Sequence, residues 1–136
     1  MSKNAAKPGS VIESFKVKEG HLVVGGMTLD RLTDRVGRTP YYAYDRAQIT
    51  QRIKYLRGVL PRSIHVHFAM KANPMPAVVQ HIAGMVDGLD VASAREMSVA
   101  LDTPMPAELI SFAGPGKTAQ ELSQAVAAGV VLNLES

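Results

Sequence analysis

Four short apolar runs at a nearly constant spacing place the strongest constraint on the fold of this chain. They cover residues 64–70, 86–92, 109–113 and 130–134, so that their starts are 22, 23 and 21 residues apart. Each run has the length of a buried β-strand, and each interval leaves room for one helix. Strand–helix alternation at this period predicts an α/β fold with βα units around a parallel sheet, as an open sheet or a barrel.

The intervals between the runs carry recognisable helix start and stop signals. These are Pro76 before a helix over residues 77–85, the capping-box pairs Ser93 with Glu96 and Thr118 with Glu121, and Gly129 at a helix end. The last run stops within residues 133–136, with no helix after it. A closed barrel needs eight units and about 250 residues, so we expect this chain to be about half a barrel.

The first part of the chain has a different pattern. Residues 15–24 predict two short strands with a turn at Glu19 and Gly20, and residues 41–44 predict a further extended piece. Asp45 is a suitable N-cap for a helix that Pro61 would stop. One apolar face of that helix would carry Ile49, Ile53, Leu56 and Leu60. Residues 1–10 are expected to be a flexible tail.

Composition narrows the classes of function. The chain of 136 residues has no Cys, which excludes disulfides and thiolate metal sites, and a net charge of +3 from scattered basic residues. No basic stripe with stacking aromatics predicts nucleic-acid binding. No apolar run has the ~18 residues needed to span a bilayer. We therefore expect a cytoplasmic protein without a nucleic-acid or membrane partner.

The first apolar run ends on a candidate nucleophile, Lys71. Period-2 alternation separates two faces: Val66, Phe68 and Met70 toward the helices, and His65, His67, Ala69 and Lys71 toward the interior. Barrel enzymes place their chemistry at the carboxyl ends of strands. An amine held there among apolar walls would favour its neutral form, which can attack an aldehyde to form a Schiff base. The alternative is a lysine that extends to solvent from a strand end.

The second run offers Asp90 as a possible partner for that amine. Alternation places Asp90 with Gly88 and Ala92 on the interior face, at about the depth of Lys71 on the neighbouring strand. Its carboxylate could be a counter-charge for a protonated amine or imine. It could equally accept a hydrogen bond from a neighbouring loop.

Several segments resemble one family. Residues 68–74, Phe-Ala-Met-Lys-Ala-Asn-Pro, resemble the lysine motif of the fold-type III, alanine racemase-like decarboxylases that depend on pyridoxal 5'-phosphate (PLP). That family includes the diaminopimelate, ornithine and arginine decarboxylases. The similarity continues over residues 39–45, 89–96, 110–117 and 133–136, in the same order and spacing. It is greatest to the exosortase-associated decarboxylases.

The resemblance implies a fold, a cofactor and site residues. The fold would be the N-terminal portion of a TIM-type (β/α)8 PLP-binding barrel, with about four βα units over residues 36–136. Residues 11–35 would contribute an N-terminal strand to a second β-domain. Lys71 would be the catalytic residue that holds PLP as a Schiff base, with Asp90 and Ala69 lining the cofactor pocket.

The resemblance also implies what lies outside these residues. In relatives, a glycine-rich loop binds the cofactor phosphate and an acidic residue contacts the pyridine nitrogen. Relatives also form a head-to-tail homodimer. The expected function is PLP-dependent decarboxylation of an amino acid by a longer chain, with this chain inactive by itself. Arg95 departs from the family, in which a small residue or glycine is more common at that position.

Four other interpretations remain open. Two are close to the first: a PLP-dependent racemase, or a PLP-binding barrel without catalytic activity. Residues 111–118 match the second half of a phosphate-binding P-loop, but Ser111 occupies the position of its first glycine. His65 and His67 could bind a metal, although no third ligand has suitable spacing.

Overall fold

A computed structural model describes residues 15–135, which divide into two compact units between Ile49 and Thr50. The predicted tail over residues 1–10 lies outside the described residues. Among residues 15–135, no helix combines the length and the apolar character needed to cross a bilayer. The boundary between two domains at residues 35 and 36 concerns the longer protein and stays a prediction.

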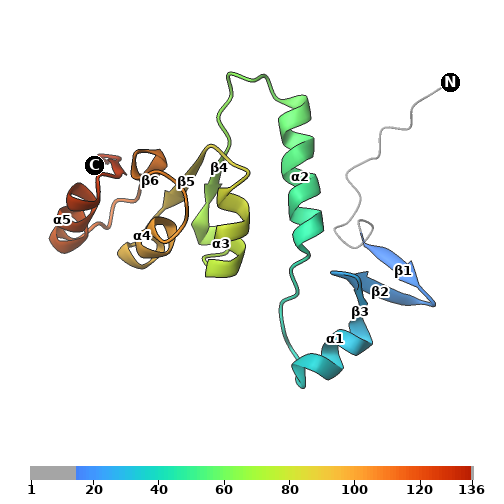
Figure 1. The fold of residues 1–136 in the computed structure, drawn as a ribbon. Coiled ribbons are helices and arrows are strands. Elements are labelled where there is room, and N and C mark those ends of the chain that lie inside the picture. The colour runs from blue at the N-terminus through green and yellow to red at the C-terminus, as the bar shows by residue number, and fades with distance from the viewer. Residues whose placement is uncertain (1–14, 136) are drawn as a thin grey trace. The chain divides into compact units, whose positions relative to one another are not determined.

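The first unit contains a small antiparallel sheet (Figure 1). Its strands are β1 (Lys16–Lys18), β2 (His21–Val24) and β3 (Met27–Thr28), in the order β1-β2-β3. The predicted turn is confirmed: Glu19 and Gly20 have φ angles of 52° and 81° and connect the paired residues Lys18 and His21. The three strands therefore form a sheet of their own, in which each strand pairs with the strand next to it in the sequence.

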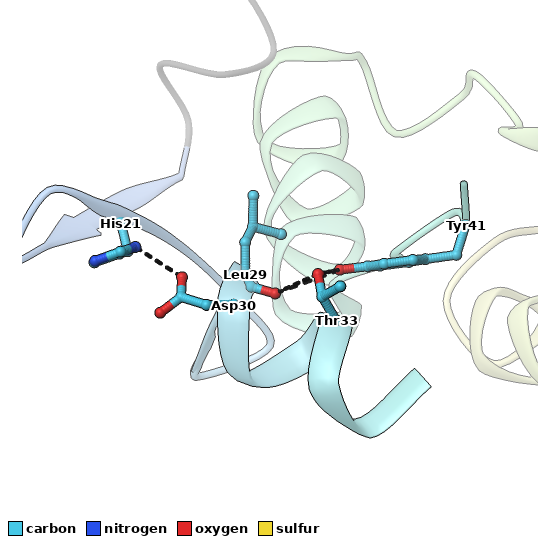
Figure 2. Close-up of polar contacts among 5 residues, drawn as sticks. All are labelled: His21, Leu29, Asp30, Thr33 and Tyr41. Carbon is cyan, nitrogen blue, oxygen red and sulfur yellow. Dashed lines mark hydrogen bonds and ion pairs between the residues drawn. The ribbon is translucent and has the colours of Figure 1, made fainter. Parts of the chain in front are cut away.

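A helix that the sequence patterns did not indicate, α1 (Leu29–Val36), follows this sheet directly. Figure 2 shows how side chains attach it to its surroundings. The Thr33 hydroxyl donates to the Leu29 carbonyl at 2.8 Å, and the Tyr41 hydroxyl lies 2.8 Å from Thr33 Oγ1. His21 Nδ1 lies 2.7 Å from Asp30 Oδ1. These contacts connect α1 to β2 and to the segment that precedes the next helix.

The helix predicted after Asp45 is confirmed as α2 (Arg46–Val59). Asp45 Oδ1 accepts a hydrogen bond from the Ala47 N–H at 2.8 Å, and Oδ2 accepts one from the Gly25 N–H at 2.9 Å. These donors, Gly25 above all, hold the pKa of the Asp45 carboxyl below its ordinary value. The predicted apolar face consists of partly buried residues, namely Ile49, Ile53, Leu56 and Leu60.

The second unit contains the predicted parallel sheet, with strands in the order β4-β5-β6-β7. The first three of these strands are labelled in Figure 1. The strands are β4 (His67–Ala69), β5 (Gly88–Val91), β6 (Ile110–Phe112) and β7 (Val131–Leu132). The helices between them are α3 (Pro76–Ala83), α4 (Ala94–Leu101) and α5 (Ala119–Ala128). All four strands are shorter than the apolar runs that predicted them. In two of the runs, 3₁₀ turns at Met70–Ala72 and Ala107–Leu109 take up one end.

One apolar core holds the second unit together. The largest side chains that are fully enclosed come from the sheet, the turn after β4, and α3; they are Phe112, Met70, Leu89, Ile110, Val79 and Val91. Met97 and Ala100 of α4 and Ala125 of α5 belong to the same cluster, as do Ala83, Met105 and Val130. The predicted apolar face of β5 is confirmed, since Leu89 and Val91 are both buried.

Helix capping follows the sequence prediction for α5 and only half of it for α4. Thr118 and Glu121 form the complete capping box. At α4, the Ser93 hydroxyl accepts from the Glu96 N–H at 3.2 Å, as predicted. The Glu96 carboxylate, however, accepts from the Ala92 N–H at 2.7 Å instead of closing the box on Ser93.

The carboxylate of Glu121 caps two helices. Its Oε2 accepts from the Thr118 N–H at 2.9 Å, and its Oε1 accepts from the Ala94 N–H, in the first turn of α4, at 3.0 Å. These hydrogen bonds, led by the one from Thr118, hold the pKa of Glu121 below its ordinary value.

At the opposite end of the sheet, Asp87 joins three segments. Its Oδ2 accepts from the Val66 N–H at 2.7 Å and pairs with the Arg57 guanidinium of α2. The bond from Arg57, followed by the one from Val66, lowers the pKa of Asp87 to about 2. This ion pair fixes the end of α2 beside the start of the sheet.

Candidate functional site

A pocket of about 400 Å³ lies at the carboxyl ends of the parallel strands. Its lining comes from segments at the ends of all four strands and consists of Ala69, Lys71, Asp90, Val91, Ala92, Ser111, Ala113, Gly114, Asn133 and Glu135. This is the edge at which parallel α/β proteins bind ligands, because the loops that follow the strands converge there. The three residues singled out from the sequence, Lys71, Asp90 and Ala69, are all part of this lining.

Lys71 lies in the pocket, but its environment differs from the prediction. The chain leaves β4 after Ala69 and enters a 3₁₀ turn, closed by a hydrogen bond of 2.9 Å from the Asn73 N–H to the Met70 carbonyl. Met70 takes the buried position, and Lys71 is exposed. Within residues 15–135 the Lys71 ammonium has no hydrogen bond or ion pair. The amine is therefore accessible in this chain and not enclosed by apolar walls.

Asp90 faces the pocket as strand alternation predicted, and its direct partner is a histidine. Asp90 Oδ1 lies 3.0 Å from His67 Nδ1 on the neighbouring strand. The register places Asp90 opposite Ala69, two residues before Lys71. No ion pair joins Asp90 to Lys71 in the described part of the chain, and the Asp90 carboxylate is paired with His67.

Three further polar residues line the pocket at β6 and just after β7, and no role was predicted for them: Ser111, Asn133 and Glu135. Asn133 Nδ2 donates to Ser111 Oγ at 3.1 Å. The Gly114 N–H donates to the Glu135 carboxylate, 2.9 Å from Oε2. The same alternation that selected Asp90 could have identified Ser111, which lies between buried Ile110 and Phe112.

Lys117, central to the P-loop alternative, has a structural position. Its ammonium donates to the carbonyls of Gly114 and Asn133, at 2.7 Å each, and lies 5.7 Å from the centroid of the Phe112 ring. These contacts join the loop after β6 to the end of β7. They leave the ammonium engaged by the protein itself instead of free for a phosphate.

The metal alternative has little support in the geometry. Among residues 15–135, no group of three or more His, Cys, Asp or Glu side chains is arranged to hold a metal ion. His67 is paired with Asp90.

Fold and site together define the class of this protein as an α/β protein with a parallel sheet and a pocket at the carboxyl edge of the strands. Comparison with known proteins identifies the family. The sequence model of the family described as "Pyridoxal-dependent decarboxylase, pyridoxal binding domain" matches residues 46–136. The chain belongs to this family, as the resemblance of the lysine motif indicated.

Known proteins of this family cover nearly the whole chain. It is 37% identical over 127 residues to the diaminopimelate decarboxylase of Zymomonas mobilis, a match to 90% of this chain and 30% of that protein. A crystal structure of an Aquifex aeolicus protein superposes with a TM-score of 0.81 and 32% identity, covering 90% of this chain and 30% of that one.

A crystal structure of diaminopimelate decarboxylase from Helicobacter pylori, complexed with L-lysine, matches at a TM-score of 0.69 and 28% identity. It covers 79% of this chain and 28% of that one. The chain thus spans about 30% of the length of the relatives it matches. The predicted fold class, the N-terminal part of the PLP-binding barrel, is confirmed.

The residues present fit the cofactor that the family implies. The pocket is within the range of volumes that hold small ligands. It offers an exposed amine, Lys71, to an aldehyde, and small side chains, Ala69 and Ala92, beside it. Asp90 adds an acceptor for a protonated group.

Proposed function

We propose that this chain is part of a longer protein that decarboxylates an amino acid with PLP, and that Lys71 holds the cofactor. The observation that carries the proposal is the exposed amine of Lys71, unpaired within residues 15–135, in a pocket at the carboxyl edge of a pyridoxal-binding barrel. An amine without a competing partner can react with the aldehyde of the cofactor.

Three residues have separate roles in this proposal. Lys71 holds the cofactor covalently through Nζ. The small side chain of Ala69 leaves room for a flat ring to approach the sheet. Asp90 places a carboxylate beside the amine and accepts a hydrogen bond from a protonated nitrogen. PLP supplies the electron sink that lets an amino acid lose its α-carboxylate as carbon dioxide.

The rest of the site is proposed to come from outside this chain. Residues for the cofactor phosphate, the pyridine nitrogen and the substrate would follow residue 136, so this chain by itself is expected to be inactive. Diaminopimelate is the substrate that the names of the relatives suggest, and L-lysine is the ligand named for the Helicobacter pylori structure. A homodimer and a cytoplasmic location remain part of the proposal, as does the assignment of residues 11–35 to a second β-domain.

Covalent labelling tests the role of Lys71. The chain is incubated with PLP, reduced with borohydride and digested, and the labelled peptide is identified by mass spectrometry. We expect one dominant label on Lys71 and its loss in Lys71→Ala. Lys54→Ala is the matched control, because Lys54 is an exposed lysine on α2 outside the pocket. Label spread evenly over the surface lysines would contradict the proposal for this chain.

The reaction is tested in the complete protein. Carbon dioxide release from an amino acid, absent in Lys71→Ala, is the expected result. Exchange or inversion at the α-carbon without release of carbon dioxide would instead identify a racemase. Binding of PLP with neither reaction would favour a non-catalytic barrel protein.

A further inference from the structure

The contact between His67 and Asp90 fixes the form of both side chains. His67 Nδ1 lies 3.0 Å from Asp90 Oδ1, and both side chains are partly exposed, by 33% for His67 and 40% for Asp90. An ionised carboxylate can only accept hydrogen bonds. Where Asp90 is ionised, the hydrogen of this contact is therefore on Nδ1 of His67.

Gly88 makes room for this contact. It is the residue opposite His67 in the pairing of β4 with β5. A Cβ atom at Gly88 would lie 2.4 Å from Cε1 and 2.7 Å from both nitrogens of the His67 ring. The imidazole thus occupies the volume that any other side chain at this position would need. Gly88 is not among the glycines with a positive φ angle, so the space for the ring is what a substitution would remove.

The contact leaves one half of the Asp90 carboxylate available. Oδ1 is held by His67, and within residues 15–135 no hydrogen bond involves Oδ2. The other charged groups of the pocket are Lys71, which is unpaired in the described chain, and Glu135, which accepts from the Gly114 N–H. His65, two residues before His67 on the same strand face, makes no hydrogen bond to Asp90.

We propose that His67 is a positioning residue for Asp90. Its Nδ1–H holds Oδ1 so that Oδ2 is directed toward a ligand bound in the pocket. Gly88, which has no side chain, leaves the space that the His67 ring occupies. The proposal rests on the proposed function, since Asp90 is positioned for the cofactor that Lys71 would hold. It deepens that function by adding a histidine and a glycine that do not themselves line the pocket.

The pair can be tested first without a cofactor. Long-range ¹H–¹⁵N NMR of this chain reports which ring nitrogen carries the hydrogen. We expect His67 in the Nδ1–H form when the ring is neutral, and a change toward the Nε2–H form in Asp90→Leu. The His65 ring should be unaffected by Asp90→Leu. An Nε2–H form of His67 that Asp90→Leu leaves unchanged would overturn the pairing, whatever the labelling of Lys71 shows.

The effect on the site is tested in the complete protein by PLP affinity. His67→Leu is expected to weaken binding about tenfold, the scale of one hydrogen bond to a charged group. His67→Asn should restore most of the affinity, because the Asn Nδ2 is as far from the backbone as the imidazole Nδ1. In a double-mutant cycle, His67→Leu should have no further effect once Asp90 is Leu.

Gly88→Ala provides a test that changes neither partner. It should displace the ring and weaken PLP binding as much as His67→Leu does. Gly84→Ala is its matched control, since a Cβ there would meet nothing within 4 Å, and His65→Leu is the control for loss of a histidine. Urea denaturation of each variant separates unfolding from altered binding.

The proposal would be refuted if His67→Leu and Asp90→Leu lowered the PLP affinity by additive amounts in the double-mutant cycle. Equal losses of affinity in His67→Asn and His67→Leu would also refute it. Wild-type affinity in a folded Gly88→Ala protein would also refute it. Suppose that the Lys71→Ala protein is still labelled by PLP as strongly as wild type, while NMR shows an Nδ1–H form of His67 that depends on Asp90. The proposed function then fails, and the pairing of His67 with Asp90 stands.

Discussion

Asp87 gives the clearest test of how electrostatics stabilise the second unit. Its Oδ2 accepts from the Val66 N–H and pairs with Arg57, so that α2 and the start of the sheet are joined by one carboxylate. The substitution Asp87→Asn keeps the size of the side chain and a carbonyl acceptor for Val66. It removes the charge, and with it most of the interaction with Arg57.

The size of the effect follows from the pKa of Asp87, which the fold lowers from 3.8 to about 2. Taken in full, a shift of nearly two units corresponds to about 2.5 kcal/mol. A third of the Asp87 side chain is exposed, however, and solvent screens the ion pair. We therefore expect Asp87→Asn to lower the free energy of unfolding at neutral pH by about 1 kcal/mol.

The same shift predicts the pH dependence. Because the folded pKa lies below the unfolded one, the stabilisation is complete above about pH 4 and is lost as the pH falls toward about 2. The difference between wild type and Asp87→Asn should therefore shrink over this interval.

Urea denaturation at neutral pH and at several acidic pH values measures the difference directly. Asp102→Asn is the matched control, since Asp102 is an exposed carboxylate whose side chain makes no hydrogen bond within residues 15–135. Equal stability of wild type and Asp87→Asn at neutral pH would refute the reasoning. A difference that persists undiminished at pH 2 would show that the ion pair is not its source.

Three further changes test the core and the polar contacts around the sheet. Phe112→Ala should lower the free energy of unfolding by about 3–5 kcal/mol in urea denaturation, because the ring is fully buried; a cost below about 1 kcal/mol would contradict this. Thr118→Ala should cost about 1 kcal/mol and speed amide hydrogen exchange at Glu121, whose N–H loses its acceptor. Lys117→Met should cost about 1 kcal/mol and broaden the NMR signals of Gly114 and Asn133, whose carbonyls it binds; unchanged signals would show that Lys117 does not order this edge.

Local signals in the sequence predicted most of the fold because the interactions behind them span few residues. The Asp45 cap and the capping box of Thr118 each involve donors within three residues. Helix α1 was not predicted, although Gly37 at its end has a φ angle of 77° and is a stop signal; Thr28 at its N-cap makes no side-chain hydrogen bond. Its Thr33 is instead attached to Tyr41 by a contact that depends on the path of the chain beyond the helix.

The pocket was predicted in outline and not in detail for a related reason. Alternation correctly placed Asp90 and Ala69 on the pocket side of their strands. It could not show that the chain turns after Ala69 and leaves Lys71 exposed. Nor could it pair Asp90 with His67, because that contact depends on the register between two strands and on the absence of a side chain at Gly88.

The double cap made by Glu121 has a consequence for how the second unit opens. One carboxylate satisfies backbone donors at the starts of both α4 and α5, at Ala94 and Thr118. Fraying of α5 would therefore also expose an amide of α4, so local opening should spread from one βα unit to the next. The two neighbouring βα units that contain α4 and α5 would then open and close together, as a single cooperative segment.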